Sequence, residues 1–215
     1  MYKFIFFALF SMTATSLVAQ ESFSKISLSG FTVHLTQSDQ FSIEANPDFE
    51  IEKTVKNDAL YIPSYSDSLG FTVERIEDEV LYIGVIDQTG RVPKSTISIS
   101  VKELRYLSLH NSVLVMDSAI TVDSLDVMAA CSFGELKVNA NYLTITTGAG
   151  AQFAATGSAE QLVCNVGGAS SLSASKLIAD QADIGVMGYS QLYVNAKKVR
   201  SLDCAEDSRV IHLAK

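Results

Sequence analysis

Residues 143–194 read LTITTGAGAQFAATGSAEQLVCNVGGASSLSASKLIADQADIGVMGYSQLYV, and one short pattern recurs in them at nearly equal intervals. Each unit contains an apolar residue, an intervening residue and a second apolar residue, and a turn of small residues follows. Alternation of apolar and polar residues is typical of a strand with one buried face. The stretch therefore predicts a series of short strands that all bury the same face.

The pattern extends over residues 107–204, and its period of about 18–20 residues is typical of solenoid repeats. The first apolar position holds Leu107, Leu125, Leu143, Leu162, Ala182 and Leu202. The second position, two residues later, holds Leu109, Val127, Ile145, Cys164, Ile184 and Cys204.

Units of this length are too short for a strand followed by a crossover helix, and they lack a two-residue hairpin signal such as Asn-Gly. If each unit forms one coil, the coils stack as parallel strands about 4.8 Å apart, and equivalent residues form internal ladders. Each large ladder residue then contributes about 1.5–3 kcal/mol on burial. We predict an all-β solenoid, a parallel β-helix. A bundle of short helices is the alternative, and residues 173–184 are its best segment.

Three glycines, Gly148, Gly168 and Gly188, recur at equal intervals within the small-residue turns. Glycine tolerates positive φ and lets neighbouring backbones approach closely. We therefore expect these glycines to form the turns between strands. The turns match neither the dinucleotide-binding fingerprint nor the P-loop.

The three cysteines are Cys131, Cys164 and Cys204. The last two occupy one ladder but lie two coils apart, roughly 9.6 Å from the strand spacing. That separation exceeds the Cα distance a disulfide allows. We predict three unpaired thiols, with Cys164 and Cys204 packed as small core residues.

The residues before the repeat also alternate, and residues 23–62 predict four or five short strands. Residues 64–95 interrupt this rhythm and predict a surface excursion with one hairpin. Because an open coil exposes unpaired backbone and an apolar cross-section, we expect the N-terminal strands to cap one end of the solenoid. At the other end, charged residues that discourage edge pairing flank the last strand, namely Arg209, His212 and Lys215.

Residues 1–20 read MYKFIFFALFSMTATSLVAQ and combine Lys3, a short apolar run and a stretch of small residues. This is the pattern of a secretory signal peptide, with cleavage expected after Ala19 or Gln20. A membrane anchor would need about 20 predominantly apolar residues, and serines and threonines interrupt this run. We expect an exported protein that is periplasmic, cell-surface or secreted.

The remaining chain, residues 21–215, is expected to form a single domain, with strands and excursion in 21–101 and coils in 102–215. Hydrophobic residues make up 47% of the 215-residue chain, which is too apolar for a disordered protein. The net charge of −8, without a basic run, argues against nucleic-acid binding. No segment after the leader is long and apolar enough for membrane insertion.

Several segments together resemble the auto-transporter adhesin head GIN domain family over residues 23–215. They are FSKISLSGFTVHLTQSDQFSIEA (23–45), VKNDALYI (55–62), STISISVKELRYLSLHNSVLV (95–115) and the turns GAGAQF, GGASSL and MGYSQL. The resemblance implies a right-handed parallel β-helix preceded by strands, in exported proteins of bacterial envelopes. It supplies no catalytic residues. The chain departs from the family pattern in the excursion at 64–95 and in the turns near Cys131 and Cys204.

Two carboxylates form the one constellation with potential chemistry. Asp183 and Asp203 are predicted to share an outward column in successive coils, close enough to repel each other. A bound cation such as calcium would relieve this repulsion. Screening by water and by Lys197, Lys198 and Arg200 is the alternative that we favour.

Two functions follow from these observations. The favoured one is a non-catalytic envelope or secreted module, adhesin-like, that binds a protein or glycan partner without a cofactor. Aromatic residues in surface loops often mark recognition, and the candidate contacts are Tyr65, Phe71, Tyr82 and Tyr189. The alternative is a carbohydrate-active enzyme, a polysaccharide lyase or hydrolase, which would need a cleft holding both carboxylates.

Overall fold

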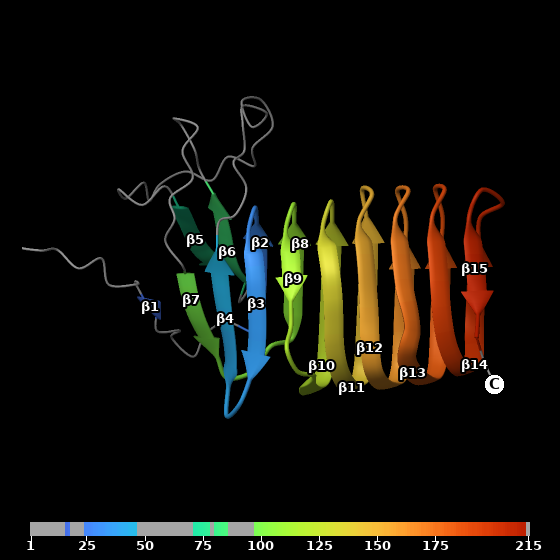
Figure 1. Ribbon diagram of the computed structural model, residues 1–215, viewed down its shortest axis with the longest axis horizontal. Helices are drawn as coiled ribbons and strands as arrows, with labels where there is room; N and C mark the ends of the chain where they lie inside the picture. The colour runs from blue at the N-terminus through green and yellow to red at the C-terminus, as the bar shows by residue number, and fades with distance from the viewer. Residues whose placement is uncertain (1–15, 18–23, 47–70, 78–79, 86–96, 214–215) are drawn as a thin grey trace, which may run out of the picture.

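The computed structural model describes residues 16–17, 24–46, 71–77, 80–85 and 97–213, and every element in them is a β-strand. The strands follow one another along a rod that ends at β15 (Figure 1). The N-terminal strands are β1 (Ser16–Leu17), β2 (Lys25–Ser29), β3 (Thr32–Gln37), β4 (Phe41–Asn46), β5 (Phe71–Glu77), β6 (Val80–Val85) and β7 (Ile97–Val101). The coil strands are β8 (Tyr106–His110), β9 (Val113–Val115), β10 (Ile120–Ala130), β11 (Phe133–Gly148), β12 (Gln152–Val166), β13 (Ser171–Val186), β14 (Gln191–Cys204) and β15 (Arg209–His212).

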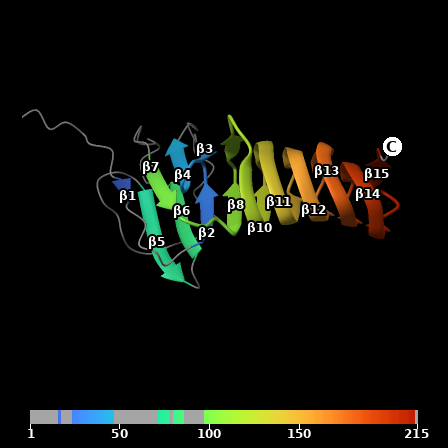
Figure 2. The ribbon, with the colours of Figure 1, turned by 90° about the horizontal axis from the view of Figure 1, so that it is seen from below.

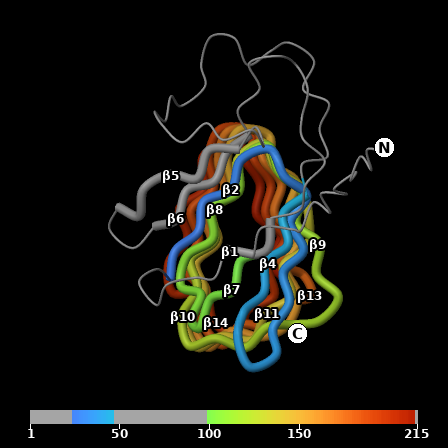
Figure 3. The backbone as a smooth tube through the Cα atoms, turned by 90° about the vertical axis from the view of Figure 1, so that its left-hand side faces the viewer, coloured from blue at the N-terminus to red at the C-terminus, as the bar shows by residue number. Residues whose placement is uncertain are grey.

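The coil strands pair in parallel, each with the equivalent strand of the next coil. Viewed along the rod, the coils superimpose on a common closed outline (Figure 3), and Figure 2 shows their strands side by side. The predicted parallel β-helix is confirmed. The helical alternative is wrong, because residues 173–184 lie within β13.

The predicted ladders form from the second unit to the fifth. At the first unit the register is two residues away from the prediction, because Leu107 lies opposite Val127 and Leu109 opposite Ala129. Leu125 lies opposite Leu143, Leu143 opposite Leu162, and Leu162 opposite Ala182. The residues of both ladders are at most 4% exposed, namely Leu107, Leu109, Leu125, Val127, Leu143, Ile145, Leu162, Cys164, Ala182 and Ile184. Burial of matching apolar side chains along one axis therefore holds the coils in register.

The predicted ladders are wrong at the last coil. Ala182 lies opposite Val199, and Ile184 lies opposite Leu202, because the register between β13 and β14 shifts between Ala174 and Ile178 and again between Ala182 and Asp183. The first shift leaves three residues of β13 without a partner, and the second leaves one residue of β14 without a partner, so the later residues pair two places away from the expected partners. Cys204 consequently lies opposite Val186.

The cysteines differ in environment. All three are free, Cys164 is buried, and Cys131 and Cys204 are exposed. The prediction that Cys204 packs in the core is therefore wrong, since it sits in the terminal coil. Burial raises the pKa of Cys164 to about 12, so this thiol stays protonated.

The turns between strands contain a column of buried serines, namely Ser112, Ser132, Ser170 and Ser190. The hydroxyl of Ser132 accepts a hydrogen bond from the backbone N–H of Ser112, and Ser190 does the same for Ser170. Ala151 takes the serine position in the middle turn, where its own N–H bonds instead to the carbonyl of Gly148. Hydroxyl groups thus satisfy buried backbone donors from coil to coil.

Gly168 and Gly188 fulfil the expectation of positive φ, with values of 61° and 66°. A Cβ on Gly168 would lie 2.8 Å from the backbone nitrogen of Ala149 in the preceding turn. Gly148 differs from the expectation, because positive φ in its turn falls on Ala149 and Gly150. The close stacking of the turns thus requires glycine at position 168, whereas a Cβ at position 148 would meet no atom within 4 Å.

The N-terminal strands cover the first coil. β2 pairs with β8, and β3 pairs with β9, so β2 and β3 form one more coil. β4 and β7 continue the sheet on β3, whereas β6 and its antiparallel partner β5 continue it on β2. The hairpin expected within residues 64–95 is β5–β6. The predicted leader lies outside the described residues, apart from the two residues of β1, which pair with β7.

Candidate functional site

The most exposed large apolar side chain is Tyr189, at 79%, among the residues whose side chains the structure describes. It follows Gly188 at the apex of the turn between β13 and β14, and both residues have positive φ. The equivalent positions in the two preceding turns hold Gly168–Ala169 and Ala149–Gly150. The chain thus places a tyrosine where the two preceding turns carry only alanine and glycine. In the earlier turns, Asn111 and Cys131 have positive φ directly before Ser112 and Ser132.

Tyr189 contributes little to the stability of the fold. The left-handed region costs a non-glycine residue roughly 1–2 kcal/mol. A side chain that is 79% exposed recovers little of this cost by burial. Met187, two residues earlier, is also 59% exposed, so the turn presents two large apolar side chains to solvent. A strained, exposed aromatic residue suggests a role in contact with another molecule.

The other predicted contacts do not gather around Tyr189. Phe71 begins β5, and Tyr82 lies in β6, opposite Glu74 of the same hairpin. This hairpin is at the N-terminal end of the rod, whereas the Tyr189 turn is near its C-terminal end (Figure 1). Tyr65 lies outside the described residues. The candidate contacts within the described residues therefore lie at two separate places along the rod, and not in one composite site.

The two carboxylates do not share a column. Asp183 lies opposite Ser201, and Asp203 lies opposite Gly185, so the prediction that they stack is wrong. The register shifts between β13 and β14 that displace Leu202 also displace Asp203. The spacing of the repeat predicts that the two aspartates lie side by side, but the observed strand pairing separates them.

Asp183 is instead bound by its own neighbours on β14. The Nε of Arg200 donates to its carboxylate at 3.1 and 3.3 Å, a second guanidinium nitrogen contacts it, and Ser201 Oγ donates at 2.8 Å. Hydrogen bonds from Arg200, and then from Ser201, hold the pKa of Asp183 below its usual range. This arrangement satisfies the charge within the protein, as the screening alternative expects. The described residues contain no group of three His, Cys, Asp or Glu side chains suited to a metal ion.

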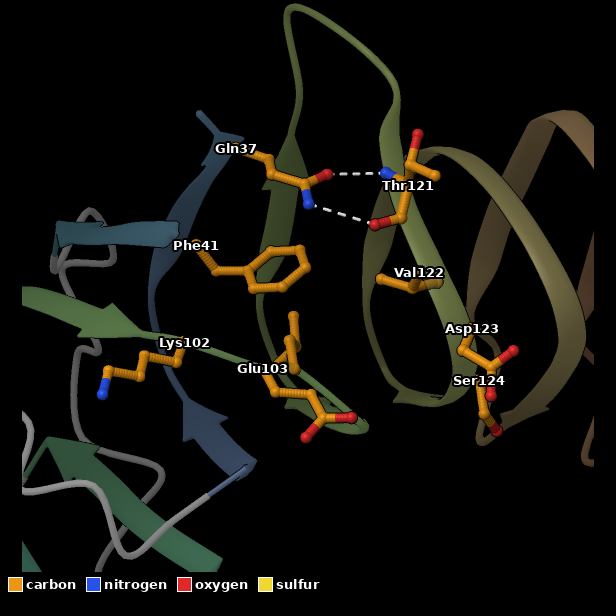
Figure 4. Close-up of a pocket in the computed structure, with 9 residues that line it drawn as sticks. Gln37, Phe41, Lys102, Glu103, Thr121, Val122, Asp123 and Ser124 are labelled. Carbon is orange, nitrogen blue, oxygen red and sulfur yellow. Dashed lines mark hydrogen bonds between the residues drawn. The ribbon is translucent and has the colours of Figure 1, made fainter. Parts of the chain in front are cut away.

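A shallow pocket of about 200 Å³ lies where the N-terminal strands meet the first coils (Figure 4). Its lining residues are Gln37, Phe41, Lys102, Glu103, Leu104, Thr121, Val122, Asp123 and Ser124. The amide of Gln37 accepts from the backbone N–H of Thr121 at 2.6 Å and donates to its carbonyl at 3.0 Å. Gln37 therefore fastens the cap to the coils.

Sequence reasoning missed this pocket. Its hydrogen-bonded residues Gln37 and Thr121 are 84 residues apart in the sequence, and no local motif marks the junction. Three of its lining residues are charged, namely Lys102, Glu103 and Asp123. Arg105 contacts the Glu103 carboxylate at 2.8 Å, and this hydrogen bond lowers the pKa of Glu103, whereas the nearby charge of Asp123 acts in the opposite direction. The described part of the chain contains no helix long and apolar enough to span a membrane.

Solved structures share this architecture. A "putative adhesin" from Bacteroides fragilis has a TM-score of 0.56 and 15% identity, over 90% of this chain and 92% of that chain. A "putative adhesin" from Parabacteroides merdae has a TM-score of 0.54 and 16% identity, over 91% of both chains. A "putative lipid binding protein" from Parabacteroides distasonis has a TM-score of 0.53 and 11% identity, over 90% and 93%. At these identities the likeness concerns the fold.

No curated protein matches the sequence. The family model described as "Putative auto-transporter adhesin, head GIN domain" matches residues 22–210. That match covers the N-terminal strands and almost all of the coils, which confirms the resemblance found in the sequence. The chain belongs to the auto-transporter adhesin head GIN domain family.

Proposed function

We propose that this protein is an exported, non-catalytic envelope module that binds a protein or glycan partner in the manner of an adhesin. The turn that carries Tyr189 is the main contact in this proposal, and the hairpin with Phe71 and Tyr82 is a second one. Tyr65, which precedes that hairpin in the sequence, is a further contact. Membership of a family described as adhesins supports the binding role.

The observation that carries the proposal is the exposure of Tyr189 at positive φ. Stability alone would favour glycine or asparagine at this position, because these residues adopt the left-handed region more readily. Selection for a contact explains why a large aromatic side chain occupies it. Aromatic side chains are also enriched among residues that dominate binding energy.

A binding role is also favoured over polysaccharide cleavage. Glycosidases need two carboxyl groups facing one scissile bond. Here Asp183 is engaged by Arg200 and Ser201, and Asp203 lies opposite a different residue of β13. The polysaccharide-cleaving alternative loses the pair of acids on which it depended.

The binding test uses purified residues 21–215 on an array of glycans and envelope proteins. Tyr189→Asn keeps a residue that tolerates positive φ, so the variant should be at least as stable as the parent protein in thermal unfolding. We expect its binding to the ligand found on the array to fall at least tenfold, about 1.4 kcal/mol. Tyr142→Asn, at a 51% exposed tyrosine elsewhere, is the matched control and should bind normally. If Tyr189→Asn binds the ligand as tightly as the parent protein, Tyr189 is not a contact and this part of the proposal is wrong.

Export is tested separately, by expressing the full chain in a Gram-negative bacterium and fractionating the cells. Mass spectrometry should find a protein outside the cytoplasm that begins at Gln20 or Glu21. A cytoplasmic protein that retains residues 1–20 would contradict the export part of the proposal.

A further inference from the structure

We propose that the C-terminal end of the solenoid binds a second copy of this chain, with the β14 edges of the two copies paired antiparallel about a twofold axis. The proposal goes beyond the partner-binding function and does not depend on it. It rests on the interior of the last coil, on the free edge of β14, and on the order of charges along that edge.

The interior of the last coil is open. In the preceding coil Ala182, Ile184 and Val186 are at most 4% exposed. Their partners on β14 are Val199, which is half-buried, Leu202, which is 57% exposed, and Cys204, which is exposed. Leu213, just after β15, is 42% exposed. In the preceding coil these interior positions are covered by β14. At the end of the rod the corresponding apolar side chains are exposed to solvent.

The backbone at this end is also free to pair. β14 pairs with β13 along most of its length, but β15 covers only Gln191–Val194 on the other side. Among the described residues, the outer edge of 195–204 faces no strand, although Nε2 of His212 lies 2.8 Å from the carbonyl oxygen of Ala196. An unpaired edge of this length is a template for another strand. A copy of β14 would pair with the N–H and C=O groups beyond Ala196 and cover Leu202.

The charges along the edge select the orientation of the partner. Within β14 the edge carries three cations, Lys197, Lys198 and Arg200, followed by the anion Asp203, and Glu206 and Asp207 follow in the turn between β14 and β15. Antiparallel pairing of two copies places the cations of each toward Asp203 and the acidic turn of the other. Parallel pairing would place like charges together.

Two of these cations already have partners on β13. Lys197 lies 2.7 Å from Asp180, and Arg200 binds Asp183. Lys197 is 71% exposed, and exposed ion pairs are weak and easily shared, so its charge remains available to a second anion. Lys198 is exposed and forms no ion pair within the described part of the chain, so it supplies the most direct cationic contact.

A second copy also fits this end better than the opposite end of the rod. The opposite end is covered by β4, β5 and β6, two of which run antiparallel to the strand beside them. Head-to-tail stacking would therefore not continue the parallel coil. An interface made by the same patch on both copies closes as a dimer and leaves no further free end.

The test exchanges the charges of the edge in the mature protein. One variant, Lys197→Glu/Lys198→Glu, makes the edge anionic, and a second, Asp203→Lys/Glu206→Lys, makes it cationic. Sedimentation velocity over a concentration series should show a dimer for the parent protein and at least tenfold weaker self-association for each variant. An equimolar mixture of the two variants should recover the dimer, because each edge then meets its complement.

Two charge reversals away from the edge, Glu160→Lys and Lys176→Glu, are the controls and should leave the dimer unchanged. Thermal unfolding should confirm that all variants remain folded, since every exchanged side chain is exposed. A parent protein that stays monomeric overturns the proposal. So does a pair of edge variants that dimerise as the parent does, or a mixture that fails to recover the dimer.

Discussion

Ser170 and Ser190 occupy the same position in successive turns, but only the hydroxyl of Ser190 accepts a hydrogen bond, from the backbone N–H of Ser170. The hydroxyl of Ser170 is buried and has no partner in the described structure. The reason lies one turn earlier, where Ala151 directs its N–H to the carbonyl of Gly148. The two serines therefore form a matched pair for measuring what the turn hydrogen bond contributes.

We expect Ser190→Ala to lower the free energy of unfolding by about 1–3 kcal/mol, because it leaves a buried N–H without an acceptor. Ser170→Ala removes an unpartnered hydroxyl and should change stability by less than about 0.5 kcal/mol. Urea unfolding of both variants measures the difference. Equal losses would mean that the serine column does not act through this hydrogen bond.

The cysteines allow a second prediction at this scale. Burial raises the pKa of Cys164 to about 12, while Cys131 and Cys204 are exposed. Because the thiolate is the reactive form, an alkylating reagent at neutral pH should label two cysteines in the folded protein and three after unfolding. Peptide mass spectrometry identifies them. Labelling of Cys164 as fast as Cys204 would show that the core of the coil is open.

Asp183 gives a prediction that depends on pH. Its folded-state pKa is lowered by Arg200 and Ser201, so its contribution to stability is fully present above the ordinary aspartate pKa of 3.8. The contribution is lost as the pH falls through the lowered folded-state pKa. Asp183→Asn should therefore be less stable than the parent protein at neutral pH, and the difference should narrow as the pH falls below 3.8. A stability gap that persists at low pH would contradict the ion pair with Arg200.

At the scale of the element, the sequence predicts the apolar ladders but not the register shifts between β13 and β14. The apolar ladders follow directly from residue spacing in the second to fifth units, whose strands keep the predicted partners. The two register shifts between β13 and β14 have no such signal, because Leu202 and Cys204 continue the apolar spacing while the strand register changes. Together these shifts give Asp203 and Cys204 partners two residues away from the expected ones.

The turn glycines provide the prediction at this scale. Gly168→Ala should destabilise the protein, because φ is 61° and the added Cβ would meet the backbone nitrogen of Ala149. Gly148→Ala meets no atom within 4 Å and should be neutral or slightly stabilising. The melting temperatures of the two variants test this difference. A Gly168→Ala variant as stable as Gly148→Ala would show that the turns are not closely stacked.

At the scale of the molecule, the repeat predicts the solenoid because each coil buries its apolar residues against the equivalent residues of the neighbouring coil. The junction around Gln37 could not be predicted in this way, since it joins strands from distant parts of the chain and carries no motif. The candidate contact Tyr189 could be identified as a surface aromatic from the sequence. Its strained turn geometry becomes visible only when the stacked turns are compared.

The central claim is that the N-terminal strands and the coils form one continuous stack in register. One outward column follows the pairs Thr32–Val113, Val113–Phe133, Phe133–Gln152, Gln152–Ser171, Ser171–Gln191 and Gln191–Arg209. Nitroxide labels at Thr32 and at one of three later positions in this column measure the stack directly. The exposed Cys131 and Cys204 are first replaced by Asn and Ser, and the labelled protein is diluted with unlabelled protein so that dimers add no second distance.

Pulsed electron paramagnetic resonance should give backbone separations from Thr32 of about 19 Å to Ser171, about 24 Å to Gln191 and about 29 Å to Arg209, at about 4.8 Å per coil. The distance should therefore grow by one strand spacing with each coil. Three distances that do not increase in this order, or a step unlike one strand spacing, would contradict the continuous stack.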